Sequence, residues 1–185
     1  MRVLIVSGHL VDRPGREPPR FPQHLVGEVT AEMSAIFEEW DIGPETAVFC
    51  GGARGADIIG AELALRRGAS VHLFLALPPE EFVRSSVDLP GTTWRARFEE
   101  LRRHVKVRAL QAGAATGDEV FARTNEWMVD EALRLDPEPR AIVVWDGKAG
   151  DGPGGTADLV SRLRHEPGDP RIRIIDPTVL IPRHS

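Results

Sequence analysis

Hydrophobic residues along this chain form short continuous runs that alternate with longer stretches of helical period. Continuous apolar runs of strand length are typical of strands covered on both faces of a sheet. The runs predict six strands, RVLIVSG (2–8), TAVFC (46–50), VHLFLAL (71–77), residues 105–110, AIVVWD (141–146) and RIRIID (171–176).

Apolar positions spaced three and four residues apart fill most of the segments between these runs. The first such series runs from Leu25 to Trp40 and ends before Gly43-Pro44. The others predict helices over residues 56–67, 94–105, 116–135 and 156–164. Parallel strands need crossover connections, which helices supply. We therefore expect an α/β, Rossmann-like, doubly wound fold, with a mainly parallel sheet of about six strands and helices on both faces.

Composition indicates one globular domain spanning residues 1–185, because 42% hydrophobic and 28% charged residues are ordinary usage for this length. A net charge of -5 argues against nucleic acid as a partner. The start MRVLIV lacks the features of a secretion signal, and no apolar run approaches a membrane span. A cytoplasmic location without membrane association is expected.

The single cysteine, Cys50, excludes an internal disulfide, and the six histidines have no metal-ligand spacing. We expect neither a metal nor a cofactor.

The first of two glycine-rich loops, CGGARGAD (50–57), connects a predicted strand to a predicted helix. In sheets of this class, ligands bind outside the carboxyl ends of the strands. Gly51, Gly52 and Gly55 would let the backbone approach an anion closely, and amides at a helix start favour negative charge. The stretch matches neither GxGxxG nor GxxxxGK[ST], so a tight, closely packed turn is the alternative.

Two charged residues of this loop also have two interpretations each. Arg54 would clamp a phosphate, or it is solvated. Asp57 would contact a ribose, or its negative charge only interacts favourably with the helix dipole.

The second glycine-rich loop, GPGGT (152–156), follows the strand 141–146. Gly154, Gly155 and the amide and hydroxyl of Thr156 are candidates for a second phosphate contact. Asp146, at the end of the strand, and Asp158, in the first helical turn, are candidate acceptors for ribose hydroxyls. For both acids, a solvated or helix-capping role is the alternative.

The first loop begins with Ser7, Gly8 and His9, which we expect on the base or ribose side of a ligand. Four prolines between residues 14 and 22 would stiffen the segment, as suits a wall that presents Arg13 and Arg16 to an anion. A surface loop kept soluble by its arginines is the alternative.

Three segments resemble successive motifs of the SLOG superfamily, the Rossmann-like group that joins the DprA/Smf proteins to the LOG phosphoribohydrolases. They are CGGARGADIIGAELALRRGASVHLFLALP, FARTNEWMVDEAL and VVWDGKAGDGPGGTAD. SGHLVD and RFP in the first loop are most similar to SLOG domains regarded as sensors of nucleotide-derived ligands. The resemblance implies a small-molecule nucleotide or nucleotide derivative as ligand. It leaves open a homo-oligomer, a partner protein, or an interaction module whose pocket is vestigial.

The LOG branch implies an alternative function, hydrolysis of the N-glycosidic bond of nucleoside 5'-monophosphates. Arg123 stands where those enzymes carry a catalytic arginine on a helix. Asp158 stands one residue before their glutamate and is one methylene shorter. A displaced, shorter acid would lose most of the rate, so binding is preferred over hydrolysis.

Overall fold

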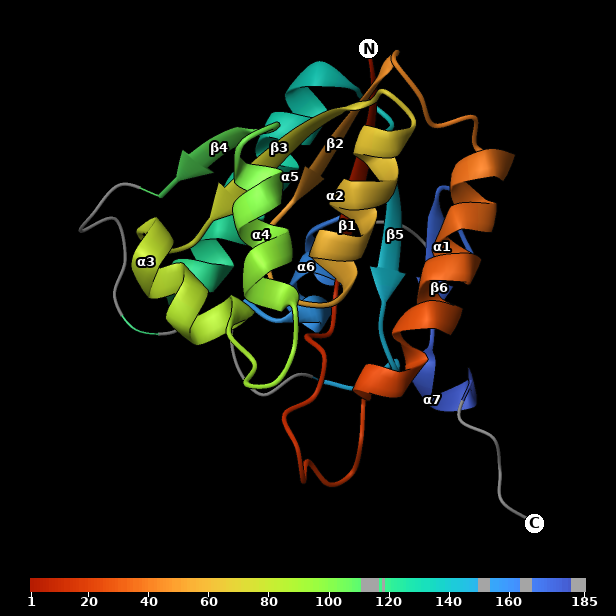
Figure 1. The fold of residues 1–185 in the computed structure, drawn as a ribbon. Helices are drawn as coiled ribbons and strands as arrows, with labels where there is room; N and C mark the ends of the chain where they lie inside the picture. Colours follow the sequence, from red (N-terminus) through yellow and green to blue (C-terminus); the bar gives the residue numbers. More distant parts are fainter. Residues whose placement is uncertain (111–116, 118, 150–153, 164–167, 181–185) are drawn as a thin grey trace.

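The computed structural model describes residues 1–110, 117, 119–149, 154–163 and 168–180. Within these residues, one sheet contains six strands, and every neighbouring pair is parallel. The strand order is β4-β3-β2-β1-β5-β6 (Figure 1). The strands are β1 (Arg2–Gly8), β2 (Thr46–Cys50), β3 (Ser70–Leu75), β4 (Lys106–Ala109), β5 (Arg140–Val144) and β6 (Ile172–Ile175).

Helices cover both faces of the sheet, so the predicted fold class is confirmed (Figure 1). One face carries α1 (Val26–Glu39), α2 (Ala56–Arg66) and α4 (Trp94–Arg102), and the other carries α5 (Glu119–Leu135) and α6 (Thr156–Arg162). The short elements are a 3-10 turn (Gln23–Leu25), α3 (Pro79–Phe82), a π-helical turn (Val83–Val87) and α7 (Pro177–Leu180).

The third strand ends earlier than predicted, at Leu75 rather than residue 77. Pro78 and Pro79 then begin α3, which continues directly into the π-helical turn. From the sequence, we expected these prolines to end the strand and did not predict a helix after them. Proline is well tolerated in the first turn of a helix, where its missing N–H has no intrahelical partner.

Alternation along the buried strands sends side chains into two apolar layers. Leu4 and Val6 pack toward α1 and α2, whereas Val3 and Ile5 pack toward α5 and α6. Helix α2 lies directly on β1, because a Cβ on Gly60 would come within 2.5 Å of Val6 Cγ1. This close contact fixes the start of α2 above the carboxyl end of the central strand.

The strand order reverses between β1 and β5, since β2 to β4 lie on one side of β1 and β5 and β6 on the other. Gly8, at φ +153°, lies so close to β5 that a Cβ there would stand 2.4 Å from the Val144 carbonyl oxygen. Chain segments leaving β1 and β5 diverge from this point, where doubly wound folds bind their ligands.

Parts of three predicted segments lie outside the described residues: Gly152 and Pro153 of the second glycine-rich loop, Thr116 and Asp118 of the helix predicted over 116–135, and Arg164 at the end of the last predicted helix. In the part of the chain that is described, no helix is both long and apolar enough to cross a lipid bilayer.

Candidate functional site

A cavity of about 430 Å³ opens at the carboxyl edge of the sheet, a volume typical of small-molecule sites. Both glycine-rich loops contribute to its wall, together with the loop after β1, the end of β3, the π-helical turn and α5. The predicted site residues that line it are Ser7, Gly8, His9, Gly51, Arg54, Asp57, Gly154, Gly155 and Thr156.

Gly52 and Gly55 have packing roles in this structure, although both were predicted to face a ligand. Gly52, at φ +82°, lies against the Phe98 ring, 3.2 Å from where its Cβ would stand. Gly55, at φ +102°, forms an antiparallel bridge with Leu10, and a Cβ there would come within 2.8 Å of the His9 carbonyl oxygen. Gly55 thereby lets the first loop approach the start of α2.

Amides of the GGARG loop already have partners within the protein. The Ala53 N–H donates to Asp57 Oδ2 at 3.1 Å, and the Arg54 N–H donates to the Ser86 carbonyl oxygen at 3.0 Å. An internal carboxylate thus takes up donor capacity that the sequence assigned to a phosphate. The side chain of Arg54, rather than these two amides, is the group this loop offers to an anion.

Asp57 is a buried carboxyl group in the first turn of α2. Its Oδ1 atom is buried and has no hydrogen-bond partner in the part of the chain that the structure describes. Burial raises the pKa of Asp57 to about 7, although the backbone amides of Ala53, Gly51 and Gly52 oppose that rise. Near neutral pH the group therefore exchanges a proton, so its charge in the cavity wall depends on pH.

Arg54 is 4% exposed and is held by a hydrogen bond from Nε to the Val11 carbonyl oxygen at 2.9 Å. Its Nη1 atom is buried and has no acceptor among the residues that the structure places. Desolvation lowers the pKa of Arg54, and the positive charge of Arg13 lowers it further, while Asp12 opposes both. A buried guanidinium donor without an acceptor is costly, and an anionic ligand would supply one.

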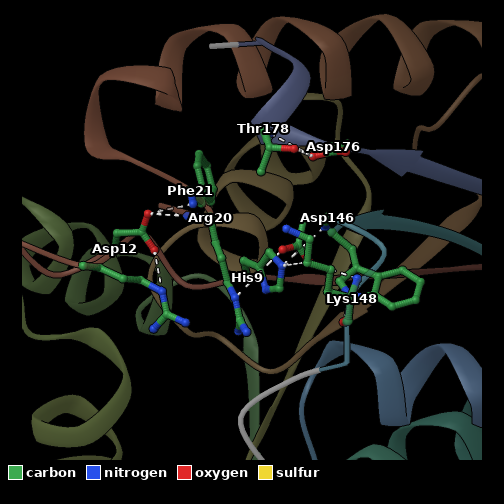
Figure 2. A network of polar contacts seen from close by, with 10 residues as sticks. His9, Asp12, Arg20, Phe21, Asp146, Lys148, Asp176 and Thr178 are labelled. Carbon is green, nitrogen blue, oxygen red and sulfur yellow. Dashed lines mark hydrogen bonds and ion pairs between the residues drawn. The ribbon is translucent and has the colours of Figure 1, made fainter. Parts of the chain in front are cut away.

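His9 and Asp146 connect the ends of β1 and β5 (Figure 2). His9 Nε2 lies 2.9 Å from Asp146 Oδ1, and the two side chains are 8% and 2% exposed. Burial by itself would raise the pKa of Asp146, but the hydrogen bonds from His9 and the Lys148 amide outweigh it and hold the pKa below its usual value. Asp146 is therefore an acceptor, and His9 Nε2 is the donor.

Asp146 lies outside the cavity lining, so it contacts His9 rather than presenting its carboxylate to a ribose. Arg20 Nε also lies 3.9 Å from Asp146 Oδ2. Asp146 was predicted to contact the ligand, and in the structure it holds His9, which lines the cavity.

Asp12 organises the loop after β1 (Figure 2). Its Oδ2 accepts the amide protons of Arg20 at 2.8 Å and Phe21 at 2.9 Å. The Asp12 N–H donates to the Phe21 carbonyl oxygen at 2.8 Å, and the Phe21 ring is fully buried. These contacts hold the loop against the cavity, as expected for a wall that prolines stiffen.

Part of the cavity wall is apolar, and the sequence analysis did not predict it because its residues belong to no single motif. Its residues are Phe74, Ala76, Phe82, Phe121 and Met128. They come from β3 and the segment after it, α3 and α5. Their signal in the sequence was weak, because aromatic residues in buried strands and helices are more often core than ligand contacts.

The two residues of the hydrolase alternative lie away from the cavity lining. The Arg123 side chain is 61% exposed and pairs with Glu126 at 3.3 Å. Asp158 accepts hydrogen bonds from Asn125 Nδ2 and Arg162 Nε, both at 2.9 Å. Asn125, which the sequence did not single out, also donates to the Gly154 carbonyl oxygen at 3.0 Å and so ties the second glycine-rich loop to α5.

Among the residues with described positions, no group of three or more His, Cys, Asp or Glu side chains is placed to hold a metal ion.

No protein-family model matches this chain, and no curated protein matches its sequence. Two solved structures are similar in fold. TM1055, a structural-genomics target, is 15% identical with a TM-score of 0.43, over 88% of this chain and 68% of that one. DNA processing protein A (DprA) from Streptococcus pneumoniae is 11% identical with a TM-score of 0.42, over 95% of this chain and 58% of that one. Both likenesses are too distant to assign the chain to a family.

Proposed function

We propose that this chain binds a nucleotide or a nucleotide-derived ligand in the cavity and acts as a sensor of that ligand. The observation that carries the proposal is the pairing, in one cavity, of an apolar wall with a buried guanidinium whose Nη1 has no acceptor among the described residues. Nucleotides combine a flat, weakly polar base with an anionic phosphate, so they match both features.

In the proposed complex the phosphate lies near Arg54, in a cavity that Gly154, Gly155 and Thr156 also line. The base lies against the aromatic part of the wall, which includes Phe121. Ser7 and His9 face the sugar between them. The motif resemblance to SLOG sensor domains points to the same class of ligand.

Thermal unfolding of the purified chain with nucleotides tests this proposal. We expect 5'-AMP, GMP, CMP or UMP to raise the melting temperature, because a ligand that binds only the native state stabilises it by RT ln(1 + [L]/Kd). The matching nucleosides, which lack phosphate, should have a smaller effect. Absence of any shift at millimolar concentration would favour an interaction module with a vestigial pocket.

Mass spectrometry of small molecules released from the purified protein is the complementary measurement. A nucleotide that co-purifies with the chain identifies the base directly.

A further inference from the structure

Positive and negative charges in the cavity wall are not balanced. Arg16 pairs with Asp12 at 3.6 Å, and Arg20 lies 3.9 Å from Asp146. Arg13 and Arg54 also line the cavity, and neither forms an ion pair in the part of the chain that the structure describes. The chain as a whole carries a net charge of -5, so this local excess of positive charge is not a general property of its surface.

Arg54 is fixed in place. Its Nε donates to the Val11 carbonyl oxygen at 2.9 Å, and its backbone N–H donates to the Ser86 carbonyl oxygen at 3.0 Å. With 4% of its surface exposed, the side chain cannot satisfy the buried Nη1 with bulk water. Arg54 lines the cavity, so a ligand that enters it can supply an acceptor to this guanidinium.

The loop that carries Arg13 is anchored on both sides of that residue. On one side, the Val11 N–H donates to the Arg54 carbonyl oxygen at 3.3 Å. On the other, Asp12 holds the Arg20 and Phe21 amides. The Arg13 charge acts on the Arg54 guanidinium and disfavours its protonated form. Two cations that line the same cavity and repel one another are both stabilised by an anion that contacts both.

We propose that Arg13 and Arg54 together bind a terminal phosphoryl group of the ligand, a phosphate monoester rather than a bridging or cyclic phosphodiester. A terminal phosphoryl group carries a charge of about -1.5 to -2 at pH 7 and offers three acceptor oxygens. It can match two guanidinium groups, each with planar, fork-shaped donor geometry. A phosphodiester carries a single negative charge and leaves one arginine unmatched. The inference rests on the proposed function only in taking a nucleotide as the ligand.

Asp57 is the nearby acid that modifies this balance, since it lines the same cavity. Protonated Asp57 leaves the two arginine charges uncompensated, whereas ionised Asp57 offsets part of them. Binding is therefore measured at pH 7, where about half of Asp57 is protonated and a phosphate monoester, whose second pKa is about 6, keeps most of its second negative charge.

Isothermal titration calorimetry at pH 7 tests the inference on the full chain. The probes are the four nucleoside 5'-monophosphates, the 5'-methylphosphate esters of the same nucleosides, which lack one negative charge, and inorganic phosphate. We expect the best monophosphate to bind about tenfold or more tightly than its methyl ester. Arg13→Met and Arg54→Met should each weaken the monophosphate by a similar factor and affect the methyl ester less.

Two controls separate charge recognition from folding. Arg66→Met removes an equally positive, exposed side chain at the far end of α2 and should leave every affinity unchanged. Arg13 is exposed, so Arg13→Met should fold even if loss of the buried Arg54 side chain unfolds the protein. Arg54→Lys keeps the charge with a smaller change at the buried position.

The outcomes distinguish this inference from the proposed function. If a monophosphate and its methyl ester bind equally well and Arg13→Met has no effect, the phosphoryl inference is overturned while nucleotide binding stands. If inorganic phosphate binds, Arg13→Met weakens it, and no nucleotide binds more tightly, the arginine pair stands and the nucleotide ligand is overturned. If no probe binds, both are overturned.

Discussion

Two groups of charged residues near the carboxyl edge of the sheet differ in how their charges are compensated. In the cavity, Arg54 is 4% exposed, and among the described residues its Nη1 has no acceptor and Asp57 Oδ1 has no donor. On α5 and α6, outside the cavity lining, Arg123 pairs with Glu126, and Asp158 pairs with Arg162. The two cavity residues therefore keep hydrogen-bonding capacity that a ligand can use, whereas the two helix residues already have charged partners.

The largest expected effect concerns Asp146, a compensated group that contacts the lining residue His9. Asp146→Ala removes the carboxylate that accepts from His9 and from the Lys148 amide and that lies near Arg20. Breaking a buried, charged network by removing one partner costs about 3–5 kcal/mol. Urea unfolding, followed by the fluorescence of the four tryptophans, measures the loss.

Asp158→Ala is the matched control for this variant. Asp158 also accepts two side-chain hydrogen bonds, but its side chain is 23% exposed, so water replaces part of what is lost. We expect a cost of about 1 kcal/mol. Equal losses for the two variants would contradict the distinction between the cavity and the outer surface.

The second prediction concerns Asp57, whose pKa is raised from 3.8 to about 7 in the folded chain. The folded state therefore binds a proton that the unfolded state has released, and stability falls as pH rises from about 4 to 7. At about 1.4 kcal/mol per pH unit, Asp57 contributes a loss of about 3 kcal/mol between pH 5 and pH 8. Asp57→Asn cannot ionise, so its stability should fall less over that interval.

Urea midpoints of both proteins at pH 5 and pH 8 measure this difference. The exposed Asp130 on α5 provides the control, because Asp130→Asn should keep the pH dependence of the unchanged protein. A parallel pH dependence of the Asp57→Asn variant and the unchanged protein would show that Asp57 stays ionised in the fold.

The third prediction concerns the contact between the second glycine-rich loop and α5. Gly154 has φ +82°, and a Cβ there would stand 2.4 Å from both the Ala122 nitrogen and the Phe121 Cβ. Gly154→Ala should cost about 1–3 kcal/mol and displace this part of the cavity wall. Gly147→Ala, at φ +75° with open space around it, should cost about 1 kcal/mol from the backbone alone. Melting temperatures compare the two, and equal shifts would show that the loop gives way without strain.

Local sequence signals were sufficient for the fold and for the edge of the sheet that carries the cavity. Apolar runs such as residues 46–50 and glycine-rich turns such as residues 51–55 act over a few residues, so their pattern predicts strands and loops directly. The π-helical turn over Val83–Val87, which supplies Ser86 to the cavity, has no such periodic signal.

Contacts between distant segments were beyond the sequence. The acceptor of Arg54 Nε is Val11, which the Leu10–Gly55 bridge brings to it, and the donor to Asp146 is His9. The sequence offered Arg54 as a phosphate contact, and the resemblance to the LOG enzymes offered Arg123 as a catalytic arginine. Their difference in exposure, 4% for the residue Arg54 and 61% for the side chain of Arg123, depends on the packing of whole elements.

The smallest expected effect is that of Arg123→Met. The Arg123–Glu126 pair is a solvent-exposed contact between residues three positions apart on one helix, and such pairs contribute about 0.5 kcal/mol or less. The variant should match the unchanged chain in stability and in nucleotide affinity, because Arg123 does not line the cavity. Incubation of both proteins with AMP, GMP, CMP and UMP, followed by chromatography, should give no free base. Base release by the unchanged chain that Arg123→Met abolishes would mean that α5 moves this arginine onto the ligand, and the outer charges would then belong to a phosphoribohydrolase site.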